Sequence, residues 1–312
     1  MGDTVSLRVV TSAGPTDVVG TLLAASAEVL TLRRRDGTVA QITVDSIAAG
    51  RVVPPGPART VPTEELERIA ARGWRAIETE QLGEWVLRAA GGFTGRANSA
   101  LAVGDPALPP AAAVDAVQRW YAERALPPRV QLAAGAATPG LTDRLDEAGW
   151  STSPSVHVMT SELTPVLRAG QSADVEVRLD ASPDDAWLAL CRQDSPDRAG
   201  GPLPGVARQV LVNHDTVVFA SVRDGDACVA VARAAVDGRW AGLHCVEVAP
   251  SHRRQGLGRV VSAAALRWAG SRGGRHCYLQ ASTDNAAAVA LYAGLGFAVH
   301  HDYVYRIGNV EK

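Results

Sequence analysis

Two glycines between an expected strand and an expected helix are the first residues whose types and spacing could do chemistry. Residues 243–248 are mostly apolar, residues 253–258 read RRQGLG, and apolar residues then recur at helical spacing from 261 to 268. Glycine lets an anion approach backbone amides without meeting a Cβ, and a helix N-terminus offers unpaired N–H groups and partial positive charge. The pattern predicts a cradle for a diphosphate, with added charge from Arg253, Arg254 and Arg259.

Other phosphate-binding loops fit these residues less well. A P-loop needs a lysine and a hydroxyl residue after its second glycine, and no such lysine follows here. A dinucleotide-binding fingerprint needs a third glycine, where this chain has Val261. A lone Gly-x-Gly is more often a turn than a phosphate site, and this one gains weight from its position between a strand and a helix and from the residues that follow.

A second motif lies about 30 residues further on. Residues 284–297 read DNAAAVALYAGLGF, so Asp284 or Asn285 can cap a helix that Gly296 can end. Tyr292 falls on one face of this helix together with apolar residues. From the residues alone it is an ordinary core aromatic with its hydroxyl at the rim of the core.

These two motifs, in this order and spacing, resemble the signatures of the GNAT superfamily of N-acyltransferases over residues 172–306. The resemblance implies an α+β fold with a mixed central sheet, acetyl-CoA as co-substrate, and an amine acceptor that is a small molecule or a protein. It implies direct attack of the amine on the thioester in a ternary complex, with Tyr292 as the acid that protonates the leaving thiolate. The residues that it assigns to the cofactor are Val246, Val248, Arg253, Arg254, Gln255, Gly256, Leu257, Gly258, Arg259, Asn285 and Tyr292.

The general base has two side-chain candidates on the expected strand, and a water chain is a third possibility. His244 stands where one member of the superfamily carries a catalytic histidine, and its ordinary pKa near ~6.5 suits the task. Glu247 is the other candidate. Because side chains alternate along a strand, the sequence places His244 and Glu247 on opposite faces. The acceptor is expected to meet residues 187–214, where candidate contacts are Trp187, Asp194, Asp197 and His214.

Two more segments precede the one that carries the motifs. Residues 1–58 contain short β-rich runs separated by turn residues, which predicts a small closed barrel resembling a Src-homology-3 barrel. Residues 62–165 repeat part of the later segment, because the spacing of features from 120 to 150 matches that from 268 to 297.

The earlier copy lacks the glycine loop and has Leu145 in the place of Tyr292. We therefore predict three domains: the barrel over 1–58, a degenerate GNAT-like domain over 62–165, and a catalytic GNAT domain over 172–312.

Composition excludes several classes of function. The 312 residues are 46% hydrophobic and 21% charged, which is typical of a soluble protein of two or three domains. No apolar run reaches the ~20 residues that span a bilayer, and the N-terminus does not read as a signal peptide, so we expect no membrane partner and a cytoplasmic location. The net charge of −2 argues against nucleic acid as a partner. The four cysteines lack metal-ligand spacing, which predicts no metal.

Two other functions stay open on the sequence alone. One is a non-catalytic acyl-CoA-binding sensor that works through the barrel, and the other is an adaptor led by the barrel. The acceptor, the length of the acyl chain and the oligomeric state are also open, and an oligomer is compatible with the sequence.

Overall fold

The alternation of apolar and polar residues in the first segment is realised as a five-stranded antiparallel sheet. The computed structural model describes residues 4–11, 14–34, 38–52, 61–169, 175–191 and 203–309. The chain forms two compact units, Met1–Arg59 and Thr60–Lys312. The strands of the first unit, with a 3-10 turn before the last, are β1 (Thr4–Thr11), β2 (Gly14–Ala25), β3 (Val29–Arg33), β4 (Val39–Thr43), η1 (Val44–Ser46) and β5 (Ile47–Val52).

The first unit has a small core on one face of this sheet. Its strand order is β4-β3-β2-β1-β5. Alternate residues of β1, from Val5 to Val9, are buried together with Leu32 and Ile42. No ladder joins β4 to β5 among the described residues, so a closed barrel stays a prediction.

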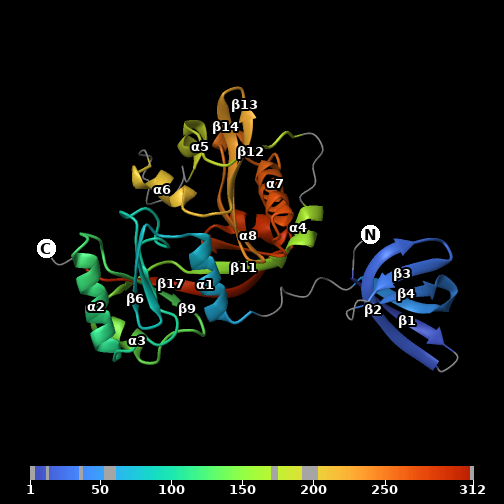
Figure 1. Cartoon of the computed structure of the whole chain (residues 1–312), viewed down its shortest axis with the longest axis horizontal. Coiled ribbons are helices and arrows are strands. Elements are labelled where there is room, and N and C mark those ends of the chain that lie inside the picture. The colour runs from blue at the N-terminus through green and yellow to red at the C-terminus, as the bar shows by residue number, and fades with distance from the viewer. Residues whose placement is uncertain are drawn as a thin grey trace. The chain divides into compact units, whose positions relative to one another are not determined.

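The second unit is built on one mixed sheet, which both sequence copies share (Figure 1). The strand order is β12-β13-β14-β15-β16-β11-β17-β9-β8-β7-β6, and β10 pairs with β17. The strands are β6 (Glu78–Leu82), β7 (Trp85–Ala89), β8 (Ala100–Leu101), β9 (Arg129–Ala133), β10 (Ser151–Thr152), β11 (Val156–Glu162), β12 (Arg178–Asp180), β13 (Val217–Asp224), β14 (Ala227–Asp237), β15 (Trp240–Val248), β16 (His276–Ser282) and β17 (Ala298–Ile307).

The sheet repeats the same strand directions on both sides of its centre, out to β13 on one side and β6 on the other, and β12 is an additional strand beyond β13. The centre is the antiparallel pair β11 and β17, flanked by antiparallel partners β16 and β9. Next come two parallel pairs, β15 with β16 and β8 with β9. The two copies have exchanged a strand, because β11 from the first copy lies against β16 and β17 from the second lies against β9. This symmetry is the structural counterpart of the repeat in the sequence.

Helices cover both faces of the sheet. In Figure 1 the long helix α7 lies along the strands β13 and β14. Its residues Val261, Ala265 and Leu266 are buried in a core with β13, β14 and β15. The opposite face buries Trp187, from α5, and Leu211, from α6, against residues of the first copy. The helices are α1 (Thr63–Gly73), α2 (Pro110–Ala122), α3 (Leu141–Glu147), α4 (Leu163–Ala169), α5 (Asp185–Leu190), α6 (Val206–Val212), η2 (Pro250–His252), α7 (Leu257–Ser271) and α8 (Ala286–Ala293).

Candidate active site

The strands β15 and β16 separate where the glycine loop begins. They pair only from Trp240 to Leu243 on β15, and among the described residues 244–248 have no partner on β16. The Ala249 N–H donates to the Val229 carbonyl at 2.9 Å, toward β14. Because amides alternate along a strand, the Val248 and Val246 amides point the other way, into the opening beside β16. Two backbone donors are thus presented to a ligand at this edge.

The glycine loop is exposed and leads directly into α7. Gly256 is the N-cap of α7 with φ of 80°, a backbone conformation that favours glycine. A Cβ placed on Gly256 would meet no atom within 4 Å, so the space over the loop is open. The amides of Leu257 and Gly258 lie in the first helical turn, where the helix offers no acceptor for them. This arrangement suits an anion such as a diphosphate.

The arginines of the loop differ in where their guanidinium groups lie. Arg253 donates from Nε to the Val248 carbonyl at 3.2 Å, and Arg254 is exposed with φ of 65°. Arg259 instead donates to the carbonyls of Ala169 and Gly294, at 3.1 and 3.2 Å. Its guanidinium therefore holds the ends of α4 and α8, away from the open face of the loop.

Helix α8 presents Tyr292 from a buried position. Asn285 caps this helix by accepting the Ala288 N–H at 3.0 Å, which confirms the predicted cap. The Tyr292 ring is buried and packs edge-on against Phe297, with the ring centroids 5.9 Å apart. Burial, and then the charge of Glu247, raise the pKa of the Tyr292 hydroxyl well above its ordinary value. This hydroxyl is fully protonated at neutral pH.

His244 and Glu247 lie on the same face of β15, so the prediction of opposite faces was wrong. Across the β14–β15 pair, Arg233 is opposite His244 and Val231 is opposite Glu247. Only one residue separates the two β14 partners, whereas two separate His244 from Glu247. The extra residue forms a β-bulge, at which Cys245 has φ of 52°, and a bulge of this kind reverses the alternation of side chains.

The two candidate bases have different surroundings. The His244 ring is 3% exposed and lies 5.1 Å from the Trp74 ring, between centroids. Burial, and then the charges of Arg96 and Arg233, lower the pKa of His244 well below its ordinary value. The Glu247 side chain is 21% exposed, and its carboxylate lies 3.8 Å from the Arg253 guanidinium, beside the glycine loop. The charge of Glu247 acts on the Tyr292 hydroxyl, whereas His244 is enclosed.

Contacts from the first copy to His244 had no signal in the sequence. Arg96 Nη1 lies 3.1 Å from His244 Nδ1, although the two residues are 148 positions apart. Trp74, at the end of α1, packs on the same ring. Local spacing cannot reveal such a pair, because only the shared sheet brings the two copies together.

The first copy carries an acid where a cofactor loop would need an open anion site. After β8, the Asp105 N–H donates to Glu84 Oε2 at 2.7 Å. A Cβ on Gly104 would lie 2.3 Å from the same carboxylate oxygen. The helix that follows, α2, begins with Pro110, which has no N–H to offer. At this edge the Glu84 carboxylate takes the place that is open over Gly256 in the second copy.

Comparison with known proteins agrees with this geometry. The family described as "Probable histone acetyltransferase Rv0428c C-terminal" matches residues 60–306. The chain belongs to this family. A "Probable histone acetyltransferase Rv0428c" of Mycobacterium tuberculosis is 32% identical over 301 residues, which are 93% of this chain and 88% of the relative. The "Uncharacterized N-acetyltransferase YobR" of Bacillus subtilis is 27% identical over 247 residues, covering 78% and 97%.

A solved structure gives the same fold. The GCN5-related N-acetyltransferase from Kribbella flavida aligns over 80% of this chain and 96% of its own, with a TM-score of 0.57 and 19% identity. The protein is thus a GNAT N-acetyltransferase, with the expected α+β fold and mixed sheet. Acetyl transfer is its general activity.

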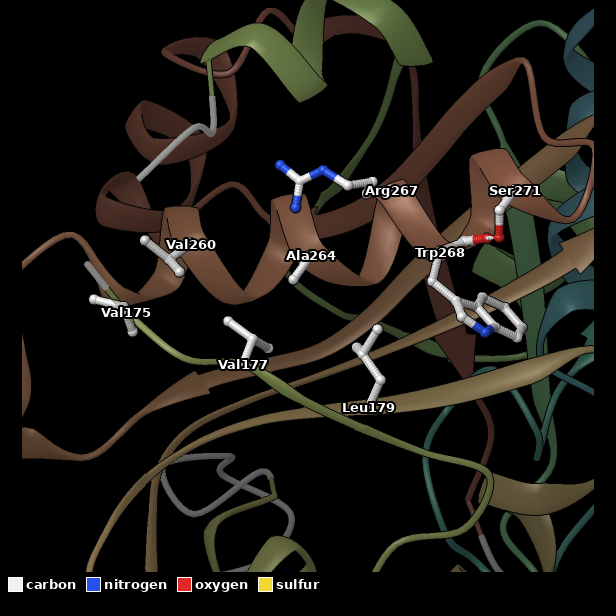
Figure 2. A pocket seen from close by; sticks show the side chains of 8 residues that line it. All are labelled: Val175, Val177, Leu179, Val260, Ala264, Arg267, Trp268 and Ser271. Carbon is white, nitrogen blue, oxygen red and sulfur yellow. Dashed lines mark hydrogen bonds between the residues drawn. The ribbon is translucent and has the colours of Figure 1, made fainter. Parts of the chain in front are cut away.

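One hollow in the described part of this acetyltransferase is not lined by the glycine loop itself. A groove of about 410 Å³ separates α7 from residues 175–179, and Val177, Leu179 and Trp268 line it (Figure 2). It is largely apolar and holds no candidate acid or base.

The expected acceptor contacts have local roles where the structure describes them. Trp187 is buried and donates from Nε1 to the Ala220 carbonyl, and His214 Nδ1 accepts the Thr216 N–H. Asp194 and Asp197 lie outside the described residues. Within the described part of the chain, no group of three potential metal ligands occurs, and no helix is long and apolar enough to cross a membrane.

Proposed function

We propose that this protein transfers an acetyl group from acetyl-CoA to a primary amine by direct attack in a ternary complex. The observation that carries the proposal is the opening beside β15, where two inward-pointing amides, the glycine loop and the Tyr292 helix meet. The loop and the first turn of α7 would hold the diphosphate, with Arg253 and Arg254 close by. The Val246 and Val248 amides would hold the pantetheine arm and polarise the thioester carbonyl.

The amine has to lose a proton before it can attack. An amine of pKa ~10.4 is neutral in about one molecule in 2,500 at pH 7, and freeing it costs ~4.6 kcal/mol. We assign the base to Glu247, directly or through water, because it is partly exposed and lies near Tyr292. The His244 ring is enclosed, has a lowered pKa and contacts Arg96. These features favour a structural or positioning role for His244.

The leaving thiolate needs a proton in return. Free thiols have a pKa of ~8.5, so a neutral hydroxyl placed at the sulfur can protonate the thiolate as the carbon–sulfur bond breaks. Tyr292 supports this role because burial keeps it protonated and because its hydroxyl makes no hydrogen bond within the described part of the chain. Glu247 takes up the proton of the amine, Tyr292 gives one to the thiolate, and a proton then passes from Glu247 through solvent to the tyrosinate, which restores both groups.

We propose that the first copy, over 62–165, does not bind acetyl-CoA. The Glu84 carboxylate at its loop and Leu145 in place of the tyrosine support this view. Its proposed contribution to the reaction is structural.

A direct test combines three substitutions with a thiol-release assay on a panel of amines. Gly256→Glu should abolish acetyl-CoA binding, because it places a negative charge over the diphosphate cradle. Tyr292→Phe and Glu247→Gln should keep binding and lose turnover by about 10²-fold or more. Full turnover in both Gly256→Glu and Tyr292→Phe would refute the proposed function.

A further inference from the structure

A rigid loop of the first copy reaches the acceptor face of β15. The loop, residues 90–99, is organised by Asn98, which is 5% exposed. Its side chain satisfies two N–H groups and two carbonyls of the loop at 2.8–2.9 Å, those of Ala90, Gly92, Phe93 and Thr94. The Thr94 hydroxyl also accepts the Trp74 indole N–H at 3.0 Å. The loop therefore holds the residue between these contacts, Arg96, in a fixed place.

Arg96 reaches His244 with most of its hydrogen-bonding capacity unused. Its guanidinium lies 5.1 Å from the Trp74 ring centroid and gives one hydrogen bond, from Nη1 to His244 Nδ1 at 3.1 Å. Among the described residues it has no acidic partner, and its side chain is partly exposed. A guanidinium has five N–H donors in a planar fork that matches a carboxylate.

A second arginine makes this region strongly positive. Arg233 is fully buried, and its guanidinium lies 5.0 Å from the same Trp74 ring centroid. It donates to the carbonyls of Leu211 and Gly73, its Nη2 has no partner, and no acid pairs with it in the described part of the chain. Burial lowers the pKa of Arg233 to about 10, so it is still charged at neutral pH.

Two more buried groups near His244 lack hydrogen-bond partners. Because an arginine can only donate, His244 Nδ1 accepts and its proton is on Nε2. Both Nε2 and the Tyr278 hydroxyl have no partner among the described residues. A Cβ on Gly242 would lie 2.6 Å from Nε2 and 2.4 Å from the hydroxyl, so both atoms converge over this glycine. Unpartnered buried donors are rare in folded proteins and call for an acceptor.

We propose that Arg96, held by His244 and Trp74, binds a carboxylate of the acceptor, so that the preferred substrates are amines that also carry a carboxylate. This inference rests on the proposed function and deepens it. Arg96 and Arg233, beside His244, supply hydrogen-bond donors and positive charge for the carboxylate. Glu247 lies further along β15, where the amine would lose its proton. Arg96 is a specificity-determining residue of the first copy that serves the active site of the second.

The geometry also limits the length of the substrate. One residue of β15, Cys245 at the bulge, separates His244 from Val246, so Val246 is two residue steps from His244, which corresponds to about 6–7 Å along a regular strand. The amine must reach the thioester carbonyl at Val246 while its carboxylate stays on Arg96. An amine several bonds away from its carboxylate meets this requirement. A cationic peptide or a diamine would place positive charge against Arg96 and Arg233.

Calorimetry on the full chain saturated with CoA tests the proposal with product-like probes. The probes are 4-acetamidobutanoate, 6-acetamidohexanoate, their carboxamides, and N-acetylputrescine. We expect at least one carboxylate to bind tenfold or more tightly than its carboxamide. Arg96→Gln should abolish this preference, and Arg96→Lys, which keeps the charge without the fork, should reduce it.

Arg272→Gln is the matched control, because Arg272 is exposed and also lies over a tryptophan ring, that of Trp268 at 5.4 Å. It should keep the full preference. If Arg96→Gln does not fold, Arg96→Lys carries the comparison. The proposal is overturned if the carboxamides or N-acetylputrescine bind as tightly, if no probe binds, or if Arg96→Gln keeps the preference. Rapid acetylation of a diamine would overturn it while leaving the proposed function intact, whereas failure to bind CoA would remove both.

Discussion

Replacing Gly256 by alanine separates the conformational role of this glycine from its role in binding. The residue has φ of 80°, and a Cβ there would meet no atom within 4 Å. Alanine in a left-handed conformation costs roughly 1–2 kcal/mol. At 2–4 °C per kcal/mol for a unit of this size, the melting temperature should fall by about 2–8 °C.

The effect on binding should be larger than this conformational cost suggests. The added methyl group would stand over the amides that we expect to contact the diphosphate. Losing one hydrogen bond to a charged group costs about 1.5–3 kcal/mol, which corresponds to a roughly 10- to 100-fold weaker Kd for acetyl-CoA. Isothermal titration with acetyl-CoA measures this change.

Gly238→Ala is the matched control. Gly238 is exposed in the turn between β14 and β15, with φ of 55° and nothing within 4 Å of its Cβ position. It should lose similar stability and keep its affinity for acetyl-CoA. If both variants bind acetyl-CoA equally well, the glycine loop does not hold the diphosphate and our reasoning is wrong.

Three further predictions concern single groups. Tyr292→Phe should lower kcat by about 10²–10⁴-fold with an unchanged Kd for acetyl-CoA, and an unaltered kcat would exclude proton donation by this hydroxyl. Because the pKa of His244 is depressed in the folded state, its stabilising contribution is present above pH ~6.5 and is lost as the pH falls through the lowered value. Urea unfolding between pH 7.5 and 5 should show this loss, at up to ~1.4 kcal/mol per pH unit, and His244→Asn should have a shallower slope. Glu67→Ala should cost about 3–5 kcal/mol in chemical denaturation, because the buried carboxylate accepts from Gln131 at 2.6 Å and contacts His301 at 2.7 Å. A cost below 1 kcal/mol would show that this network is dispensable.

The sequence was most informative where structure depends on neighbouring residues. The loop at 253–258, the start of α7 and the Asn285 cap all follow from local rules on glycine, helix termini and caps. The internal repeat was also visible, because it is a matter of spacing. These features account for the fold class and the proposed cofactor site.

Features that depend on the whole sheet could not be read from spacing. The bulge at Cys245 reverses the alternation of side chains that we used to place His244 and Glu247. No residue type in the sequence predicts this bulge. The contact of Arg96 with His244 depends on how the two copies pair. Arg259, which the resemblance assigned to the cofactor, donates to two helix ends, a contact that local spacing does not reveal.

The exchange of strands between the copies also constrains how the chain folds. The pair at the centre, β11 and β17, joins segments from distant parts of the chain, and β17 is the final strand of the sheet to be synthesised. Until it arrives, β9 and β11 each present an unsatisfied edge, which is a recognised aggregation hazard. Non-local pairing of this kind slows folding. Neither copy can therefore complete its part of the sheet before β17 is made, and removal of one copy would leave the other without a partner for its central strand.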